Sequence, residues 1–186
     1  MTSTNKTHIR AELLVGFIYR FYPPLAWFPE YRLALEIAER FNCRRVLDVG
    51  CAAGNLFVVL STRGLVDEYV GLDKRNIFRV RDPRARFIRC NARTPPPEVA
   101  GGGFDCVFFV NSLFYIGADA LKQYSMLGDV VAVIDIDPSK PHIRFVSWLE
   151  GVRRMTLREL ASYAEQLGLK VLMQVPGAQY ALVVSR

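Results

Sequence analysis

Two acidic residues and a pair of glycines stand at the ends of short apolar runs in the first half of the chain. Asp48 lies within one run and is followed by Gly50 and Gly54, while Asp73 closes a second run. A glycine has no Cβ, so glycines spaced in this way let main-chain groups approach a ligand closely. Asp48 would repel a phosphate and attract an ammonium group. The spacing therefore indicates a ligand that carries a positive charge.

Other nucleotide-binding patterns do not fit this turn. The dinucleotide fingerprint Gly-x-Gly-x-x-Gly is not matched, because position 52 is alanine and no third glycine has the right spacing. The Gly-Lys-Ser/Thr ending of a phosphate-binding loop is also missing from the sequence. An ordinary strand-turn-helix that binds nothing stays open as the alternative.

The run Asp48-x-Gly50-x-Ala52-x-Gly54 resembles the first motif of class I S-adenosylmethionine-dependent methyltransferases. That motif is written Asp/Glu-x-Gly-x-Gly-x-Gly, and alanine often replaces its middle glycine. The resemblance implies that the turn binds S-adenosylmethionine as the cofactor. The residues that it assigns to the cofactor in this turn are Asp48, Gly50, Cys51, Ala52, Gly54 and Asn55.

Two later positions agree with this resemblance. Asp73 follows the apolar run Tyr69 to Leu72, 25 residues after Asp48, where the family places an acid that accepts hydrogen bonds from the ribose hydroxyls. Lys74 or Arg75 would then lie beside the adenine ring. After the next apolar run, Asn91 and Ala92 stand where the family binds the adenine amino group. Asn91 replaces the usual aspartate, and the alternative is that it only caps a turn.

The segment from Phe104 to Tyr115 resembles the fourth strand of the family and the residues after it. Its end would face the methionine part of the cofactor and the methyl acceptor, which adds Asn111 and Ser112 to the cofactor site. No signature for a particular acceptor is present, and no base is evident. The candidate catalytic residues are Tyr22, Asn111, Ser112 and Tyr115, followed by His142, Asp135 and Asp137.

The composition of the chain argues against a membrane protein and against a metal-binding protein. The chain has 186 residues, 51% of them hydrophobic, and no apolar run long enough to span a bilayer, so we expect one core and no membrane partner. The four cysteines form no Cys-x-x-Cys pair and there are two histidines, so we expect no metal site. We interpret the cysteines as small core residues. With a polar N-terminus, these features predict a cytoplasmic protein.

Positive charge is concentrated in one segment. The net charge is +6, and the stretch from Lys74 to Arg93 holds eight basic residues against the single acid Asp82. Such a cluster is suited to RNA phosphates. A solvated edge of the domain explains the same pattern, and both interpretations stay open.

The hydrophobic patterns predict alternating strands and helices. Strands are expected at 45–50, 69–73, 86–90, 104–110 and 129–136, with a hairpin at 170–175 and 179–185. Helices are expected at 8–21, 29–41, 54–63, 117–126 and 156–167, with one helical turn at most in 74–85. The resemblance implies a three-layer α/β/α fold with a mostly parallel seven-stranded sheet in the order 3-2-1-4-5-7-6. Residues 1–28 would form an aromatic helical extension, either a lid or a packing segment, and residues 29–186 one methyltransferase-like domain.

These observations predict a methyltransferase that uses S-adenosylmethionine and methylates a small molecule. An enzyme that methylates RNA through the segment from Arg75 to Arg93 is one alternative. A non-catalytic subunit that binds the cofactor or a partner protein is another. Neither the acceptor atom nor the oligomeric state follows from the sequence.

Overall fold

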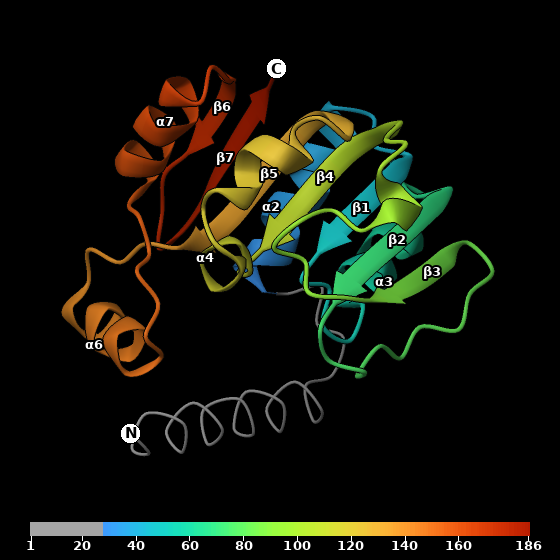
Figure 1. Cartoon of the computed structure of the whole chain (residues 1–186), viewed down its shortest axis with the longest axis horizontal. Coiled ribbons are helices and arrows are strands. Elements are labelled where there is room, and N and C mark those ends of the chain that lie inside the picture. Colours follow the sequence, from blue (N-terminus) through green and yellow to red (C-terminus); the bar gives the residue numbers. More distant parts are fainter. Residues whose placement is uncertain (1–27) are drawn as a thin grey trace.

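A seven-stranded sheet forms the centre of the computed structural model, which describes residues 28–186 (Figure 1). The strand order is β3-β2-β1-β4-β5-β7-β6, which confirms the predicted order. β7 pairs antiparallel with both β5 and β6, and the other pairs are parallel. The strands are β1 (Arg45–Val49), β2 (Glu68–Asp73), β3 (Ala85–Arg89), β4 (Phe104–Val110), β5 (Gly128–Ile136), β6 (Lys170–Val175) and β7 (Gln179–Ser185).

Helices cover the two faces of the sheet and complete the predicted three layers. One hydrophobic cluster joins the sheet to α2 (Pro29–Arg40) and α3 (Asn55–Thr62). The cluster on the other face contains residues of α4 (Leu113–Ile116), α5 (Ala120–Tyr124), α7 (Leu157–Gln166) and the short 3-10 helix η1 (Pro97–Val99). The remaining helix, α6 (Pro141–Leu149), lies apart from these layers, beyond the end of β5 (Figure 1).

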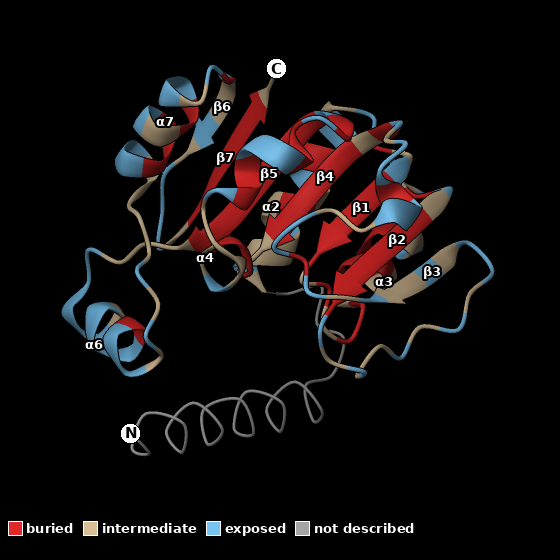
Figure 2. Ribbon diagram, viewed as in Figure 1, coloured by how far each residue is buried: buried red, intermediate tan, exposed pale blue. Residues whose placement is uncertain are grey.

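The central strands are buried because both of their faces are covered. β1, β2, β4 and β5 are almost continuous runs of buried residues, whereas the edge strand β3 is only partly buried (Figure 2). Parallel strands between two helical layers are expected to be apolar on both sides. Their carboxyl ends meet at one edge of the sheet, which is where ligands bind in open α/β folds.

Local signals explain where the helices begin. α2 has Pro29 in its first turn, and its buried residues Ala34, Ile37 and Ala38 recur at helical spacing. α7 begins after Thr156, whose hydroxyl accepts from the backbone N–H of Glu159 while the Glu159 carboxylate accepts from the Thr156 N–H. This is the capping box that the sequence predicts.

Three helical predictions differ from the structure. The helix expected at 117–126 is shorter in the structure, as α5, and the sequence did not predict α4, which Gly117, at φ 124°, separates from α5. Residues 74–84 form bends and turns without a helical turn. The sequence did not predict α6, because its apolar residues do not face the core. The helix expected at 8–21 lies outside the described residues, so the division into 1–28 and 29–186 stays a prediction.

Cys43, Cys51 and Cys106 are buried, in agreement with the interpretation of the cysteines as core residues, but the sequence did not predict that two of them are bonded. Cys43 and Cys106 form a disulfide, with 5.4 Å between their Cα atoms. Cys106 pairs with Val46 across β4 and β1, and Cys43 lies just before β1, so the fold brings together residues 63 positions apart. Sequence spacing gives no signal for such a pair. Cys51 and Cys90 are free thiols.

Residues 28–186 contain neither a helix suited to a membrane nor a cluster of metal ligands. No helix there has the length and apolar character required to cross a membrane. No group of three or more histidine, cysteine or acidic side chains in this part of the chain is arranged to hold a metal ion.

Candidate functional site

The glycine turn connects β1 to α3 through left-handed backbone conformations. Gly50, Ala52 and Gly54 have φ values of 84°, 49° and 85°. A Cβ on Gly50 would lie 2.5 Å from the Cβ of Ser112, and a Cβ on Gly54 would lie 2.6 Å from the Phe78 ring. Backbone conformation and close packing therefore both require glycine at these two positions.

Asp73 joins this turn to the end of β2. Its carboxylate is 4% exposed, and its Oδ2 accepts from the Ala52 N–H at 2.9 Å. Its Oδ1 accepts from the Arg75 N–H at 2.8 Å, and the Arg75 guanidinium donates to both oxygens at 3.2 Å. These four hydrogen bonds occupy the lone-pair positions at which a carboxylate accepts hydrogen bonds. Ribose hydroxyls would fit Asp73 in place of the guanidinium, because the two main-chain bonds hold the carboxylate at the turn.

Asp48 is buried in β1 and accepts a hydrogen bond from the Tyr69 hydroxyl. Burial raises the pKa of Asp48 to about 7, opposed by the Tyr69 hydrogen bond and reinforced by the nearby charge of Asp73. A cation beside Asp48 would favour its charged form. Burial also raises the pKa of the Cys51 thiol in the turn, so Cys51 is neutral and is no nucleophile.

The residues predicted to bind adenine lie near the end of β3. Asn91 is exposed and its Oδ1 accepts from the Arg93 N–H at 3.3 Å, as the turn-capping alternative describes. Ala92 is buried, and its carbonyl accepts from the Tyr124 hydroxyl at 3.1 Å. Lys74 is exposed directly after Asp73. The structure thus brings these positions to the same edge of the sheet, while their contact with adenine stays a prediction.

Asn111 and Ser112 follow β4 and lie beside the glycine turn. The Ser112 hydroxyl donates to the carbonyl of Val49 at 2.5 Å, so this serine connects the ends of β4 and β1. Asn111 has a left-handed φ of 51°, and its N–H donates to the Ile134 carbonyl at 2.8 Å, which connects β4 to β5. The Ser112 proton is already engaged, which favours a structural role over a catalytic one.

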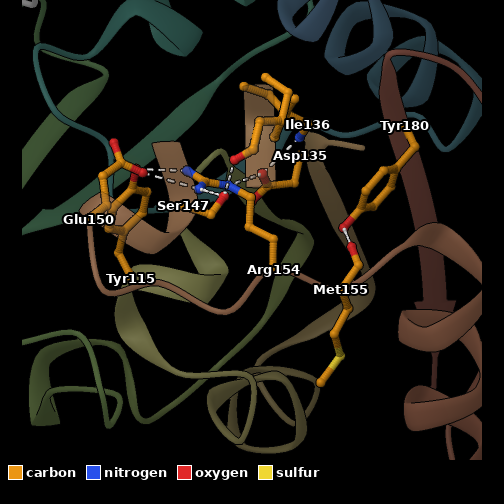
Figure 3. Close-up of polar contacts among 9 residues, drawn as sticks. Tyr115, Asp135, Ile136, Ser147, Glu150, Arg154, Met155 and Tyr180 are labelled. Atoms are coloured by element: carbon orange, nitrogen blue, oxygen red, sulfur yellow. Dashed lines mark hydrogen bonds and ion pairs between the residues drawn. The ribbon is translucent and has the colours of Figure 1, made fainter. Parts of the chain in front are cut away.

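A charged group whose central ion pair is buried lies at the end of β5 (Figure 3). Arg154 donates from Nε to Asp135 Oδ1 at 3.2 Å and from Nη1 to Glu150 at 3.1 Å. Its Nη2 donates to the Tyr115 hydroxyl at 2.7 Å, and that hydroxyl donates to Glu150 at 2.8 Å. We name these residues, together with Ser147, the Arg154 cluster. The sequence indicated Tyr115 and Asp135 but missed Arg154, because without α6 nothing placed it near the strand ends.

The other candidates are not part of this group. His142 is exposed on α6. Asp137 accepts from the N–H and hydroxyl of Ser139 in an exposed turn. Tyr22 lies outside the described residues.

Comparison with known structures gives the fold class. No family model matches the sequence, and no curated protein does. The methyltransferase domain of bacterial CtHen1 is 14% identical with a TM-score of 0.59, and the alignment covers 84% of this chain and 97% of that domain. The mitomycin 7-O-methyltransferase MmcR is 17% identical with a TM-score of 0.65 over 84% of this chain. The O-methyltransferase NcsB1 of neocarzinostatin biosynthesis, solved with S-adenosylhomocysteine and 1,4-dihydroxy-2-naphthoic acid, is 19% identical with a TM-score of 0.58 over 80% of this chain.

These similarities establish the fold of class I S-adenosylmethionine-dependent methyltransferases. The chain spans about half the length of the two O-methyltransferases, 53% of MmcR and 52% of NcsB1.

Proposed function

We propose that this protein is a methyltransferase that transfers a methyl group from S-adenosylmethionine to a small-molecule acceptor. The observation that carries the proposal is the hydrogen bond from Ala52 N–H to Asp73 Oδ2. It joins the glycine turn to the acid that the sequence assigns to the ribose of the same ligand. The fold supports the proposal independently.

When bound, S-adenosylmethionine would supply an activated methyl group on a sulfonium centre. The chain would hold it at the carboxyl ends of the strands. Asp73 would accept from the ribose hydroxyls, Asp48 would favour the positive charge of the ligand, and the small residues of the turn would allow its close approach. Asn111 and Ser112 would border the place where donor and acceptor meet. Catalysis would then depend on orientation and on exclusion of water.

Calorimetric titration with S-adenosylmethionine, S-adenosylhomocysteine and NAD tests the proposal. We expect both sulfur ligands to bind and NAD not to bind. Asp73→Ala should weaken S-adenosylhomocysteine binding at least tenfold, because a charged hydrogen-bonding group is lost. Asp82→Ala is a matched control, because Asp82 accepts from the N–H and the guanidinium of Arg84 in the same local pattern.

Binding of NAD alone would overturn the proposal. Unchanged affinity in Asp73→Ala would show that the ligand is placed elsewhere. Cofactor binding without methylation of any acceptor would favour the non-catalytic subunit.

The small-molecule acceptor is supported by the named substrates of MmcR and NcsB1. RNA is the second candidate, because five exposed arginines in and near β3 form no ion pair with any residue of the described chain. They are Arg79, Arg81, Arg86, Arg89 and Arg93. Affinity for a short single-stranded RNA that falls steeply between 50 and 200 mM salt would favour RNA, as expected for phosphate contacts. No RNA affinity at low salt would exclude it.

A further inference from the structure

The Arg154 cluster lies at the carboxyl ends of β4 and β5, outside the glycine turn, and its central ion pair is buried. The side chains of Arg154 and Asp135 are only 6% and 1% exposed. Arg154 uses four hydrogen bonds from its guanidinium, to Asp135, Ser147, Glu150 and Tyr115 (Figure 3). A guanidinium has five N–H donors, so little capacity is left for a ligand. Two carboxylates against one guanidinium also leave the cluster with an excess of negative charge.

Three buried side-chain oxygens at these strand ends have no partner within residues 28–186: Asp135 Oδ2 in the cluster, Asn111 Oδ1 beside it and Gln179 Oε1 on β7. Buried polar atoms are normally paired, because an unpaired one costs about 1–3 kcal/mol. Asp135 Oδ2 and Asn111 Oδ1 are acceptors by their chemistry, so a ligand that pairs with them must present an N–H or O–H group.

Their position connects them to the cofactor turn. The Asn111 N–H donates to Ile134, the residue before Asp135, so the two side chains come from adjacent strands. Ser112, next in the chain to Asn111, donates to Val49 at the start of the glycine turn. Neighbouring strands are about 4.8 Å apart, so Asp135 lies about two strand spacings from that turn.

We propose that Asp135 Oδ2 and Asn111 Oδ1 bind the methyl acceptor through one of its O–H or N–H groups, and that Asp135 takes up that proton during methyl transfer. This inference rests on the function proposed above and adds the chemical class of the acceptor. The acceptor is a hydroxyl or amine compound, because the negative cluster disfavours an anionic group at this point.

The transfer step balances with these groups. The O–H or N–H bond of the acceptor breaks and its proton passes to Asp135 Oδ2. The electron pair of that bond stays on the oxygen or nitrogen, which forms the new bond to the methyl carbon. The bond from this carbon to the sulfonium sulfur breaks, and its electron pair stays on sulfur in S-adenosylhomocysteine.

The charges around Asp135 are consistent with a proton acceptor at neutral pH. Burial raises the pKa of Asp135 to about 6, while Arg154 and the Ile136 N–H act against this rise. The other titratable groups that face the site are Glu150, which adds to the rise, Tyr115 on α4 and Tyr180 on β7, and burial raises the pKa of both tyrosines. Asp135 is therefore ionised above about pH 6, and a base with a pKa near the working pH is efficient.

The covering segment 137–155 determines access to Asp135. Its helix α6 buries a single residue, Ser147, whose hydroxyl accepts from Arg154 and donates to the Ile143 carbonyl. A polar attachment of this kind separates more readily than an apolar core. An acceptor would enter by displacing α6 from the strand ends, while Arg154 keeps its ion pair with Asp135.

Phenol and benzoate are suitable probes, because they share a ring and differ in whether they offer a proton or a negative charge. Each is titrated by NMR into the full chain saturated with S-adenosylhomocysteine. We expect phenol to bind more tightly than benzoate. Asp135→Asn should weaken phenol binding about tenfold, because a charged acceptor becomes a neutral one. Asp137→Asn is the matched control and should leave the phenol affinity unchanged.

The pH profile separates this role from a structural one. Phenol affinity should fall below about pH 6 in the unmodified protein and be flat in Asp135→Asn. Asp135→Asn should bind S-adenosylhomocysteine with unchanged affinity, so this proposal can fail while the proposed function stands. The role of Asp135 would be overturned if phenol failed to bind or if benzoate bound equally well. Equal effects of Asp135→Asn and Asp137→Asn on the phenol affinity would also overturn it. Failure of the unmodified chain to bind S-adenosylhomocysteine would instead overturn the proposed function.

Discussion

Asp73 and Asp82 show how one local pattern acquires two roles. Each is followed two residues later by an arginine that donates from its main chain and its guanidinium to the same carboxylate. Asp82 is partly exposed, whereas Asp73 is 4% exposed and also holds Ala52 of the glycine turn. The contact with a residue 21 positions earlier in the chain distinguishes Asp73 from the acid of an ordinary surface turn.

Arg75 should compete with the cofactor for Asp73, because its guanidinium occupies the positions that ribose hydroxyls would take. We predict that Arg75→Ala increases the affinity for S-adenosylhomocysteine about two- to fivefold, the range of a partly exposed ion pair. Calorimetry measures this directly, with Arg84→Ala as the control that removes the equivalent pair at Asp82. Weaker binding in Arg75→Ala would show instead that this arginine contacts the adenosine.

Among the strands and helices, the sequence predicted those whose hydrophobic pattern matches the faces that are covered in the fold. The strands around Leu47 and Val107 are apolar because both faces are covered, and Thr156 with Glu159 marks the start of α7. In helix α6 the apolar side chains are not the buried ones. Its large apolar side chains Phe145 and Trp148 are 59% and 73% exposed, while its buried residue is a serine. Hydrophobic periodicity cannot locate a helix that turns its polar side to the protein.

The same limit explains why the sequence indicated the glycine turn and Asp73 but not the Arg154 cluster. The turn is continuous in sequence, and Asp73 follows at a fixed distance along the chain. The cluster combines Tyr115, Asp135 and three residues of the segment 141–154, which only the folded chain brings together. A Glu150–Arg154 spacing of four residues is compatible with a helical ion pair, but it does not reveal Asp135.

Helix α6 should depend on Arg154 for its attachment. We predict that Arg154→Met exposes α6 to exchange and proteolysis, because the buried Asp135 and the partly buried Glu150 then lose the cation between them. Breaking a buried charged pair in this way typically costs about 3–5 kcal/mol. Hydrogen exchange in 141–149 should rise well above that of α7. Arg153→Met, at an exposed neighbouring position, is the control. Equal protection of α6 in the two variants would contradict the prediction.

Over the whole molecule, the disulfide and the central strands stabilise the same region. Cys43 follows α2, and Cys106 lies in β4, so the bond fastens the layer of α2 to the middle of the sheet. β1 and β4 carry the glycine turn and Asn111 at their carboxyl ends. The site is therefore built on the most buried strands, while the segment around α6 is held mainly by polar contacts. Under the proposed function, this division would place cofactor binding on a rigid base and acceptor entry on a more readily displaced cover.

The disulfide should stabilise the folded domain measurably, because it closes a loop with a sequence separation of 63 residues. Loop-closure entropy for this length corresponds to roughly 4 kcal/mol. We therefore predict that a phosphine reductant, or the double change Cys43→Ala and Cys106→Ala, lowers the urea midpoint, while Cys90→Ala has a small effect because Cys90 is a free, half-buried thiol. Thiol titration in denaturant should detect only Cys51 and Cys90 before reduction. Reaction of all four cysteines without reductant, or urea transitions that coincide with and without it, would show that the bond does not form in solution.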